Sequence, residues 1–186
     1  MSVSQLESCP NLIGGEWVPS KTSGTPVYNP STGEVIAECP VGSAAEANAA
    51  VEAAQAAFPA WMETPPVERA RMLGKFKMLM EANFDDLVRS NTREHGKTLV
   101  ESRGDVKRGM EVVEFALGVP SLMMGEVLEN MARGIDCEAI RQPLGVCVGI
   151  TPFNFPAMVP LWMYPIAIAG GNTFIHDGGG RRTRIA

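Results

Sequence analysis

One uncompensated polar side chain, Asn154, stands among Pro and Phe in the loop at residues 151–156 (TPFNFP). The loop follows a short apolar run at 146–150 and precedes an apolar segment at 157–169; a second short run occupies 173–175. This order predicts strand, loop, helix and strand, the opening of a parallel α/β sheet whose loops lie at the carboxyl ends of its strands. A buried amide needs a hydrogen-bond partner, and a ligand could supply it.

The region around this loop has a second interpretation, a membrane-spanning segment, because no charged residue occurs from Gln142 to Ile175. A spanning helix needs about 20 consecutive apolar residues, and this stretch is longer. Five prolines and a Gly-Gly-Asn break interrupt it, and each proline removes a backbone donor that lipid cannot replace. A strand covered on both faces, with its helix, also explains the absence of charge. We therefore expect no membrane association.

The composition excludes several classes of protein. The chain has 186 residues, 45% of them hydrophobic, which fits one globular domain, or one and part of another. Its net charge of −5 argues against a nucleic-acid partner. The four cysteines form no CxxC pair, so we expect neither a metal site nor a disulfide framework: Cys9, Cys39, Cys137 and Cys147. A reducing compartment fits, no export signal is visible, and we expect a cytoplasmic protein.

The elements that must position the loop begin with short strands. Residues 12–18 predict a hairpin with a Gly-Gly turn, and residues 27–36 predict another turn between strands. A helix is predicted from the N-cap Ser43, because apolar residues recur at steps of three and four as far as Trp61.

Two further helices and a polar strand are predicted before the loop. Pro65 and Pro66 end the first helix and begin the second, whose apolar stripe continues to about Arg89. The third helix begins at about Thr98. A polar strand is predicted at 135–141.

The chain changes character after Ile175. We predict a division into residues 1–175 and a divergent, disordered tail at 176–186, which has no periodicity. One strand–helix–strand unit leaves sheet edges uncovered, so the chain looks cut short, as a shifted reading frame or an interrupted gene would leave it. The alternative is that residues 178–182 (GGGRR) form an anion-binding loop, although their spacing matches neither GxGxxG nor a P-loop.

The loop at 151–156 resembles that of the aldehyde dehydrogenase superfamily, and within it that of the malonate-semialdehyde and methylmalonate-semialdehyde dehydrogenases, which form acyl-CoA using NAD. Further motifs extend the resemblance from about Leu12 to Ile175: IGGEWV (13–18), NPSTGEV (29–35), EHGKT (94–98), RGMEVVEFA (108–116), PSLMMG (120–125) and FNFPAMVPLWM (153–163). The resemblance implies an incomplete aldehyde dehydrogenase-like α/β fold. A helical region with short strands would precede the first strand–helix–strand unit of a Rossmann-like sheet, all within the N-terminal part of the NAD-binding domain.

The resemblance also implies residue roles. Asn154 matches the side-chain donor of the oxyanion hole, and losing such a donor typically costs about 3 kcal/mol; the alternative is an Asn that caps a loop. Arg108 matches the arginine that pairs with the substrate's carboxylate, for which a planar two-donor fork is suited. The alternative is a solvated helix charge. His95 is expected to be a structural residue at a helix end.

Further roles concern the tunnel and the cofactor. Phe155 and Trp162 match aromatic walls of the aldehyde tunnel, although isolated aromatic residues are more often part of a core. Four residues match backbone positions that lie along NAD, although an ordinary buried turn is the commoner reading of such a segment: Ile150, Thr151, Pro152 and Phe153.

The sequence departs from the family after Ile175. Family members are more than twice as long, and their pattern continues with Leu-Lys-Pro-Ser-Glu, whose Lys binds the adenosine ribose; here His176 and Asp177 stand instead. The catalytic cysteine and glutamate are absent, and none of the four cysteines lies in a matching motif.

The expected function is therefore the N-terminal part of an NAD-dependent, CoA-acylating semialdehyde dehydrogenase that is inactive alone. The family forms homo-oligomers, and its partners are the semialdehyde and coenzyme A. Two alternatives stay open: a non-catalytic module that binds a dinucleotide or another partner, and a non-functional product that aggregates. The sequence does not distinguish malonate from methylmalonate semialdehyde.

Overall fold

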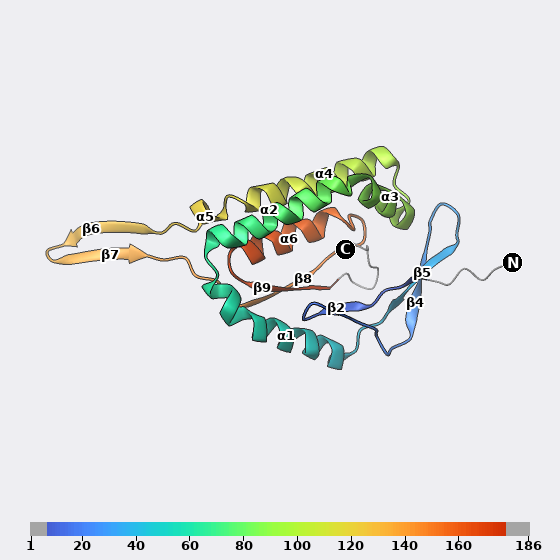
Figure 1. The fold of residues 1–186 in the computed structure, drawn as a ribbon, viewed down its shortest axis with the longest axis horizontal. Coiled ribbons are helices and arrows are strands. Elements are labelled where there is room, and N and C mark those ends of the chain that lie inside the picture. The colour runs from blue at the N-terminus through green and yellow to red at the C-terminus, as the bar shows by residue number, and fades with distance from the viewer. Residues whose placement is uncertain (1–6, 178–186) are drawn as a thin grey trace.

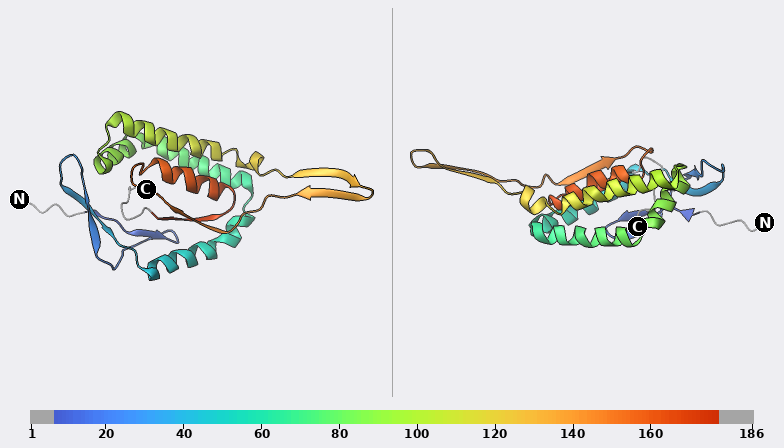
Figure 2. Two further views of the ribbon diagram at one scale, coloured as in Figure 1. Left: turned by 180° about the vertical axis from the view of Figure 1, so that it is seen from behind. Right: turned by 90° about the horizontal axis from the view of Figure 1, so that it is seen from above.

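The computed structural model describes residues 7–177. Its body is a small parallel sheet with helices on both faces, from which a two-stranded arm projects (Figures 1 and 2). Helices α2 (Pro66–Ala82), α4 (Leu99–Ala116) and α6 (Met158–Ala169) pack together as one layer. Helix α1 (Ala44–Glu63) covers the other side of the sheet.

The N-terminal strands form the predicted hairpins. Strands β2 (Asn11–Ile13) and β3 (Glu16–Val18) pair antiparallel around Gly14 and Gly15. Both glycines have positive φ, 60° and 85°, which this tight turn requires. Strands β4 (Gly24–Tyr28) and β5 (Val35–Pro40) also pair antiparallel, and the short strand β1 (Glu7–Ser8), which was not predicted, runs parallel to β5.

Helices α1 and α4 begin where the sequence predicts them. Ser43 and Thr98 are the N-caps, and each forms a capping box with a glutamate three residues later. In α1 the partner is Glu46, whose carboxylate accepts a hydrogen bond from the Ser43 backbone N–H at 2.8 Å. The Ser20 hydroxyl, followed by the backbone and hydroxyl of Ser43, lowers the pKa of Glu46 to about 2.

The prediction of one continuous second helix to about Arg89 is wrong. The chain leaves helical geometry at Asn83 and begins a new helix, α3 (Phe84–His95). The Asn83 side chain donates to the Leu79 carbonyl at 2.8 Å, and this local bond competes with helix continuation. Met72 and Leu79, two members of the predicted stripe, are exposed, whereas Leu73 and Met80 are buried.

One buried arginine on α2 forms hydrogen bonds that link α1, α2 and α6. Arg69, on α2, is 2% exposed, and its Nε donates to the Ala169 carbonyl at the end of α6 at 2.9 Å. Its Nη1 donates to the carbonyls of Met62 and Thr64 at the end of α1. Burial lowers the pKa of this guanidinium. Its planar guanidinium carries five donors in a fixed fork, so one side chain can satisfy helix-end carbonyls that lie in different directions.

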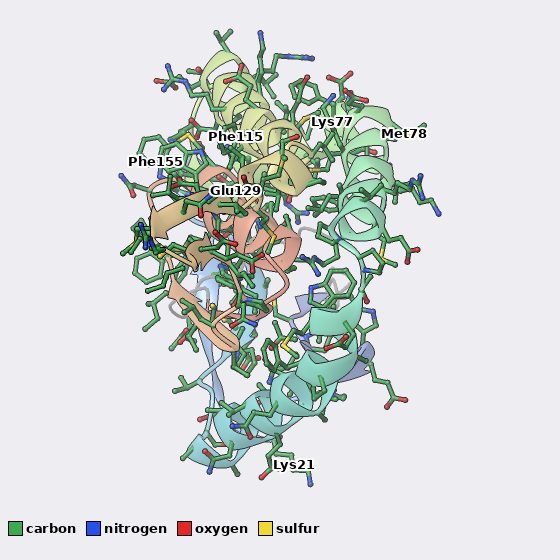
Figure 3. All side chains as sticks on the ribbon, turned by 90° about the vertical axis from the view of Figure 1, so that its left-hand side faces the viewer. Lys21, Lys77, Met78, Phe115, Glu129 and Phe155 are labelled. Atoms are coloured by element: carbon green, nitrogen blue, oxygen red, sulfur yellow. The ribbon has the colours of Figure 1, made fainter. Side chains whose placement is uncertain are left out.

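Among the described helices, the most extensive contact joins α4 to α6. Gly109 lies against Leu161, which is fully buried, so the absence of a side chain lets the two helices approach. On the outer helix of this layer, Lys77 turns toward α4 and contacts Glu114 at 3.6 Å, whereas Met78 points into solvent (Figure 3).

The predicted strand–helix–strand unit is present. Strand β8 (Val146–Ile150) is followed by α6 and then by β9 (Thr173–Asp177), which pairs parallel with β8 in the register Val146↔Thr173 to Ile150↔Asp177. Strand β9 is two residues longer than predicted, so His176 and Asp177 belong to the sheet. Residues 178–182 and the rest of the expected tail lie outside the described residues, and the division at residue 175 stays a prediction.

The arm is a hairpin of β6 (Glu126–Ala132) and β7 (Ile135–Ala139), which follow the short helix α5 (Val119–Leu122). Only β7 was predicted, because β6 carries no strict alternation of apolar and polar residues. Every residue of β6 is exposed. Within residues 7–177, no helix combines the length and the apolar character that crossing a membrane requires.

Candidate active site

The loop that carries Asn154 is fixed at both ends. At its start, the Thr151 N–H donates to the Asp177 carbonyl at 3.2 Å, and the Thr151 hydroxyl lies 3.2 Å from His176 Nε2. At its end, the Phe155 carbonyl accepts from the Val159 N–H at 3.2 Å, in the first turn of α6. Hydrogen bonds at both ends therefore hold the loop in one conformation between β8 and α6.

A lysine holds the middle of this loop. The Lys97 ammonium donates to the Asn154 backbone carbonyl at 2.7 Å and lies 3.7 Å from the centre of the Phe155 ring. It also forms an ion pair with Asp105 at 2.6 Å. Lys97 comes from the connection between α3 and α4, and Asp105 comes from α4, so three segments meet at one ammonium.

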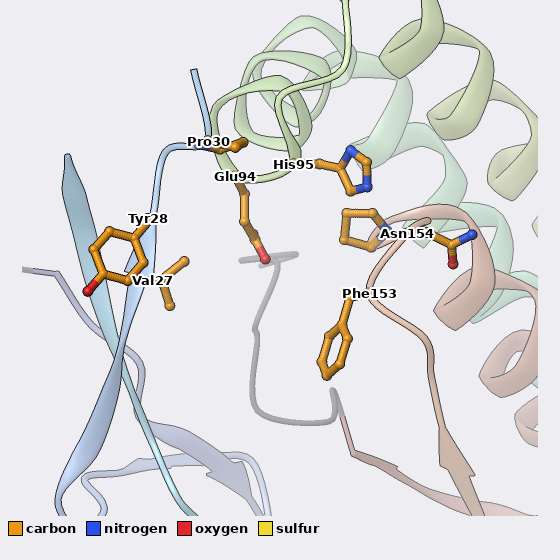
Figure 4. Close-up of a pocket in the computed structure, with 8 residues that line it drawn as sticks. Val27, Tyr28, Pro30, Glu94, His95, Phe153 and Asn154 are labelled. Carbon is orange, nitrogen blue, oxygen red and sulfur yellow. The ribbon is translucent and has the colours of Figure 1, made fainter. Parts of the chain in front are cut away.

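The side chain of Asn154 is exposed, and among residues 7–177 its amide group forms no hydrogen bond. The amide is therefore available to a ligand while the backbone beneath it is fixed. Figure 4 shows the amide directed away from Val27 and Tyr28, which lie across the neighbouring pocket. The alternative role, a loop cap, would require a hydrogen bond from this side chain to the described backbone, and none is present.

A pocket of about 310 Å³ lies between this loop, the end of α3 and strand β4 (Figure 4). Its lining combines apolar and ionisable side chains: Val27, Tyr28, Pro30, Glu94, His95, Phe153, Asn154 and Pro156. His95 is the last residue of α3, as expected for a helix-end residue. Of the predicted site residues, only Phe153 and Asn154 line this pocket.

The expected substrate residues lie toward the contact between α4 and α6. Arg108 is exposed, forms no ion pair among residues 7–177, and precedes Gly109, which packs on Leu161. Trp162 follows Leu161 and is 46% exposed. Both side chains are thus exposed to solvent near the contact between α4 and α6. Phe155 is half-buried, with the Lys97 ammonium over its ring.

The expected cofactor residues lie at the carboxyl end of β8. Ile150 and Phe153 are 69% and 47% exposed, and Pro152 is exposed as well. An exposed apolar edge at the carboxyl ends of parallel strands fits the flat rings of a dinucleotide. Thr151 differs, because it is buried: its hydroxyl lies 3.2 Å from His176 Nε2 and its backbone N–H donates to the Asp177 carbonyl.

Sequence reasoning missed Lys97 and Asp105 as parts of the site. The EHGKT motif contains Lys97, but its partners are eight and 57 residues away, so no local pattern reveals them. Cys39 is buried in β5, Cys147 lies on β8 and Cys137 lies on the arm; none lines the pocket. Within the described part of the chain, no group of three or more His, Cys, Asp or Glu side chains is placed to hold a metal ion.

Comparison with known proteins extends the resemblance. Residues 17–179 match the aldehyde dehydrogenase family. The chain is 48% identical over 176 residues to malonate-semialdehyde dehydrogenase of Bacillus pumilus, covering 94% of this chain and 36% of that protein. It is 53% identical over 167 residues to the acylating, mitochondrial methylmalonate-semialdehyde dehydrogenase of Arabidopsis thaliana, covering 89% of this chain and 28% of that protein.

A solved structure agrees with these relatives. The putative methylmalonate-semialdehyde dehydrogenase from Sinorhizobium meliloti 1021, complexed with NAD, superposes with a TM-score of 0.93 at 43% identity. The match covers 97% of this chain and 37% of that structure, so the chain spans about a third of the length of the relatives it matches. The predicted resemblance and α/β fold are confirmed, and the chain belongs to the aldehyde dehydrogenase family.

Proposed function

We propose that this chain is the N-terminal part of an NAD-dependent, CoA-acylating dehydrogenase of malonate or methylmalonate semialdehyde. The reaction transfers a hydride from the aldehyde carbon to NAD and joins the acyl group to the sulfur of coenzyme A, releasing a proton. Where the substrate carries a free carboxylate, its C–C bond breaks to release carbon dioxide, and the α carbon that keeps the electron pair takes up a proton. The observation that carries the proposal is the exposed Asn154 amide, which is fixed through its backbone at the carboxyl end of β8.

Asn154 stabilises the oxygen of the aldehyde when a thiolate adds to the carbonyl carbon. Negative charge then develops on that oxygen, and an N–H group already aimed at it need not reorganise. The exposed side chain with an unused amide is suited to this role.

Arg108 and the aromatic residues select the substrate. The Arg108 guanidinium is exposed and forms no ion pair within residues 7–177, so it is available for the substrate's carboxylate, which it can bind through two parallel hydrogen bonds. Phe155 and Trp162 would then form apolar walls beside the aldehyde carbon, and the names of the relatives support this substrate class.

Residues 150–153 provide one edge of the NAD site. NAD, when bound, accepts the hydride. Ile150 and Phe153 contribute apolar surface to it, and the backbone at Thr151 is held by Asp177 so that this edge keeps its shape.

Under this proposal residues 1–186 alone do not oxidise aldehydes, because no residue of this chain matches the family's nucleophilic cysteine or its glutamate base. Purified chain supplied with NAD, coenzyme A and malonate semialdehyde should form no NADH. Steady NADH formation would show that another group in this chain performs the chemistry.

A hybrid enzyme provides the positive test. Residues 1–175 of this chain replace the matching N-terminal residues of the Bacillus pumilus relative, and NADH and acyl-CoA formation are measured. We expect activity that requires both NAD and coenzyme A, with kcat lowered about 100-fold or more by Asn154→Ala. Arg108→Met should raise KM for malonate semialdehyde more than KM for an uncharged aldehyde of equal length. An active hybrid that shows no preference for the carboxylated substrate would contradict the assignment of Arg108.

A further inference from the structure

We propose that Lys97 is the positioning residue of this site: its ammonium fixes the Asn154 peptide and the Phe155 ring together, so that the oxyanion donor and the aromatic wall keep one relative orientation. The catalytic part of this inference rests on the proposed function. Its structural part, that Lys97 orders the loop, is independent of any activity.

Lys97 can act as a fixed point because its own backbone is fixed on both sides. Gly96 ends α3 in the left-handed conformation, with φ of 81°, and an added Cβ there would lie 2.5 Å from Pro30 Cγ. Thr98 begins α4 with a capping box: its backbone N–H donates to the Glu101 carboxylate, and the Glu101 backbone N–H donates to the Thr98 hydroxyl. The lysine therefore projects from a turn that has little freedom.

The Lys97 ammonium has three N–H donors, and it forms hydrogen bonds to two different segments, helix α4 and the loop that carries Asn154. One donates to Asp105 Oδ2 at 2.6 Å, and one donates to the Asn154 carbonyl at 2.7 Å. The charge also lies over the Phe155 ring. The Lys97 and Asp105 side chains are only 16% and 11% exposed, so water screens these contacts less than it screens surface pairs.

The carbonyl that Lys97 binds belongs to the peptide group between Asn154 and Phe155. Fixing the plane of this peptide restricts the backbone angles on either side, and with them the directions in which the two side chains leave the backbone. The Asn154 side chain makes no bond of its own within residues 7–177, so its aim depends on this plane. A misplacement of about 1 Å at a reacting group can cost about 100-fold in rate.

Other contacts already hold the surrounding helices, so loss of Lys97 should disturb the loop rather than the fold. Helix α3 packs on α4 through Val88 and Val106, and the Thr92 and Ser102 hydroxyls form a hydrogen bond at 2.8 Å. The start of the loop is bound to β9 through Thr151.

The first experiment measures order in the full 186-residue chain by NMR relaxation. In the parent chain, the backbone amides of Asn154 and Phe155 should have order parameters of about 0.85, and in Lys97→Met these should fall below about 0.6. Lys97→Arg should keep most of the order, because it retains a charged donor. Lys77→Met is the matched control: Lys77 is 21% exposed and forms ion pairs with two glutamates on another face. Order parameters that stay unchanged in Lys97→Met would overturn the proposal.

The second experiment is a double-mutant cycle in the hybrid enzyme described above. Lys97→Met should lower kcat about 10- to 100-fold while KM for NAD stays unchanged, and Lys97→Arg should recover part of the loss. If Lys97 acts through Asn154, adding Lys97→Met to Asn154→Ala should lower kcat by less than about threefold further. Two losses that simply multiply would overturn the positioning role.

The two experiments separate the failure of this inference from the failure of the proposed function. A hybrid that is inactive with all residues intact counts against the proposed function, and the NMR measurement alone then decides whether Lys97 orders the loop. An active hybrid in which Lys97→Met matches the parent in kcat counts against the inference and leaves the proposed function standing.

Discussion

The helical layer is held by contacts between residues that are far apart in the sequence, whereas the β6–β7 arm is held by contacts between neighbouring strands. Within the layer, Arg69 on α2 reaches Ala169, 100 residues later. From α1, the Trp61 indole N–H donates to the Ile168 carbonyl of α6, 107 residues later. In the arm, each strand pairs with its neighbour in the same hairpin, and β6 buries none of its residues. Both regions contain many apolar residues, so hydrophobic content alone does not distinguish them.

This difference assigns the two regions different contributions: the helical layer supplies stability, and the arm supplies exposed apolar surface. The layer buries apolar side chains between α2, α4 and α6, including Val113 and Leu161, and gains the free energy of that burial. The arm leaves its apolar side chains in solvent: Val127, Leu128, Met131 and Ile135. Substitutions should therefore affect the free energy of unfolding strongly in the layer and weakly in the arm.

The largest effect is expected for Arg69→Met. The substitution removes the charged donors that satisfy carbonyls at the ends of α1 and α6, and hydrogen bonds to charged groups each contribute about 1.5–3 kcal/mol. We expect the free energy of unfolding to fall by at least about 3 kcal/mol in urea titrations. Arg71→Met, an exposed position on the same helix, is the matched control and should change it by less than about 0.5 kcal/mol. Equal losses of unfolding free energy at the two positions would contradict the stabilising role of Arg69 in the helical layer.

A glycine pair on α4 gives the next largest effect, with opposite signs. An added Cβ at Gly109 would lie 3.1 Å from Leu161 Cβ, so Gly109→Ala should force α4 and α6 apart and cost about 1–3 kcal/mol. At Gly104 an added Cβ meets nothing within 4 Å, so Gly104→Ala should stabilise the helix by about 0.5–1 kcal/mol. Thermal unfolding of both variants measures the difference. Stabilisation by both substitutions would mean that the helix contact is looser than described.

The α1 capping box is local, like the contacts of the arm, but half-buried, and its contribution to stability should depend on pH. Because the pKa of Glu46 is lowered in the folded chain, from an ordinary 4.5 to about 2, its stabilising contribution is present above pH 4.5 and is lost as pH falls toward 2. Urea titrations across this range should show a weaker loss of stability in Glu46→Gln. Glu52→Gln, on the same helix, controls for the change in net charge. An unchanged pH dependence in Glu46→Gln would contradict the role of the carboxylate.

The smallest effect is expected in the arm. Val127→Thr and Leu128→Thr replace side chains that are 69% and 58% exposed, so each should change the free energy of unfolding by less than about 0.5 kcal/mol. Chemical denaturation followed by far-UV circular dichroism measures this. A loss of more than about 1 kcal/mol would show that the arm packs on something in solution, and the contrast with the helical layer would fail.

Much of the fold could be predicted because its signals are local. The Gly14-Gly15 turn, the N-cap Ser43 and the proline at the start of α2 act within a few residues, and these predictions are confirmed, as is the helix start at about Thr98. The break at Asn83 was missed because an apolar stripe continues across it, although the side-chain bond that ends α2 is local. Strand β6 was missed because its side chains are exposed on both faces and leave no alternation to detect.

The site was less predictable than the fold. The loop around Asn154 was visible as a polar residue in a charge-free stretch, but the roles of Arg108 and Trp162 came from family resemblance and stay predictions. Lys97 could not be assigned from spacing, because its contact with the Asn154 carbonyl requires α4 and α6 to be packed first. Contacts that depend on packing between distant segments have no signature in a short window of sequence.

The reach of Arg69 has a consequence for the order in which a ribosome delivers this chain. Its guanidinium is made 100 residues before Ala169, and bacterial or eukaryotic synthesis at about 5–20 residues per second leaves a delay of about 5–20 seconds. During that interval the Arg69 guanidinium on the nascent chain lacks the Ala169 carbonyl that it binds in the folded structure. Release of the last turn of α6 from the exit tunnel, rather than formation of the early helices, should be the event that commits the polypeptide to its native interior.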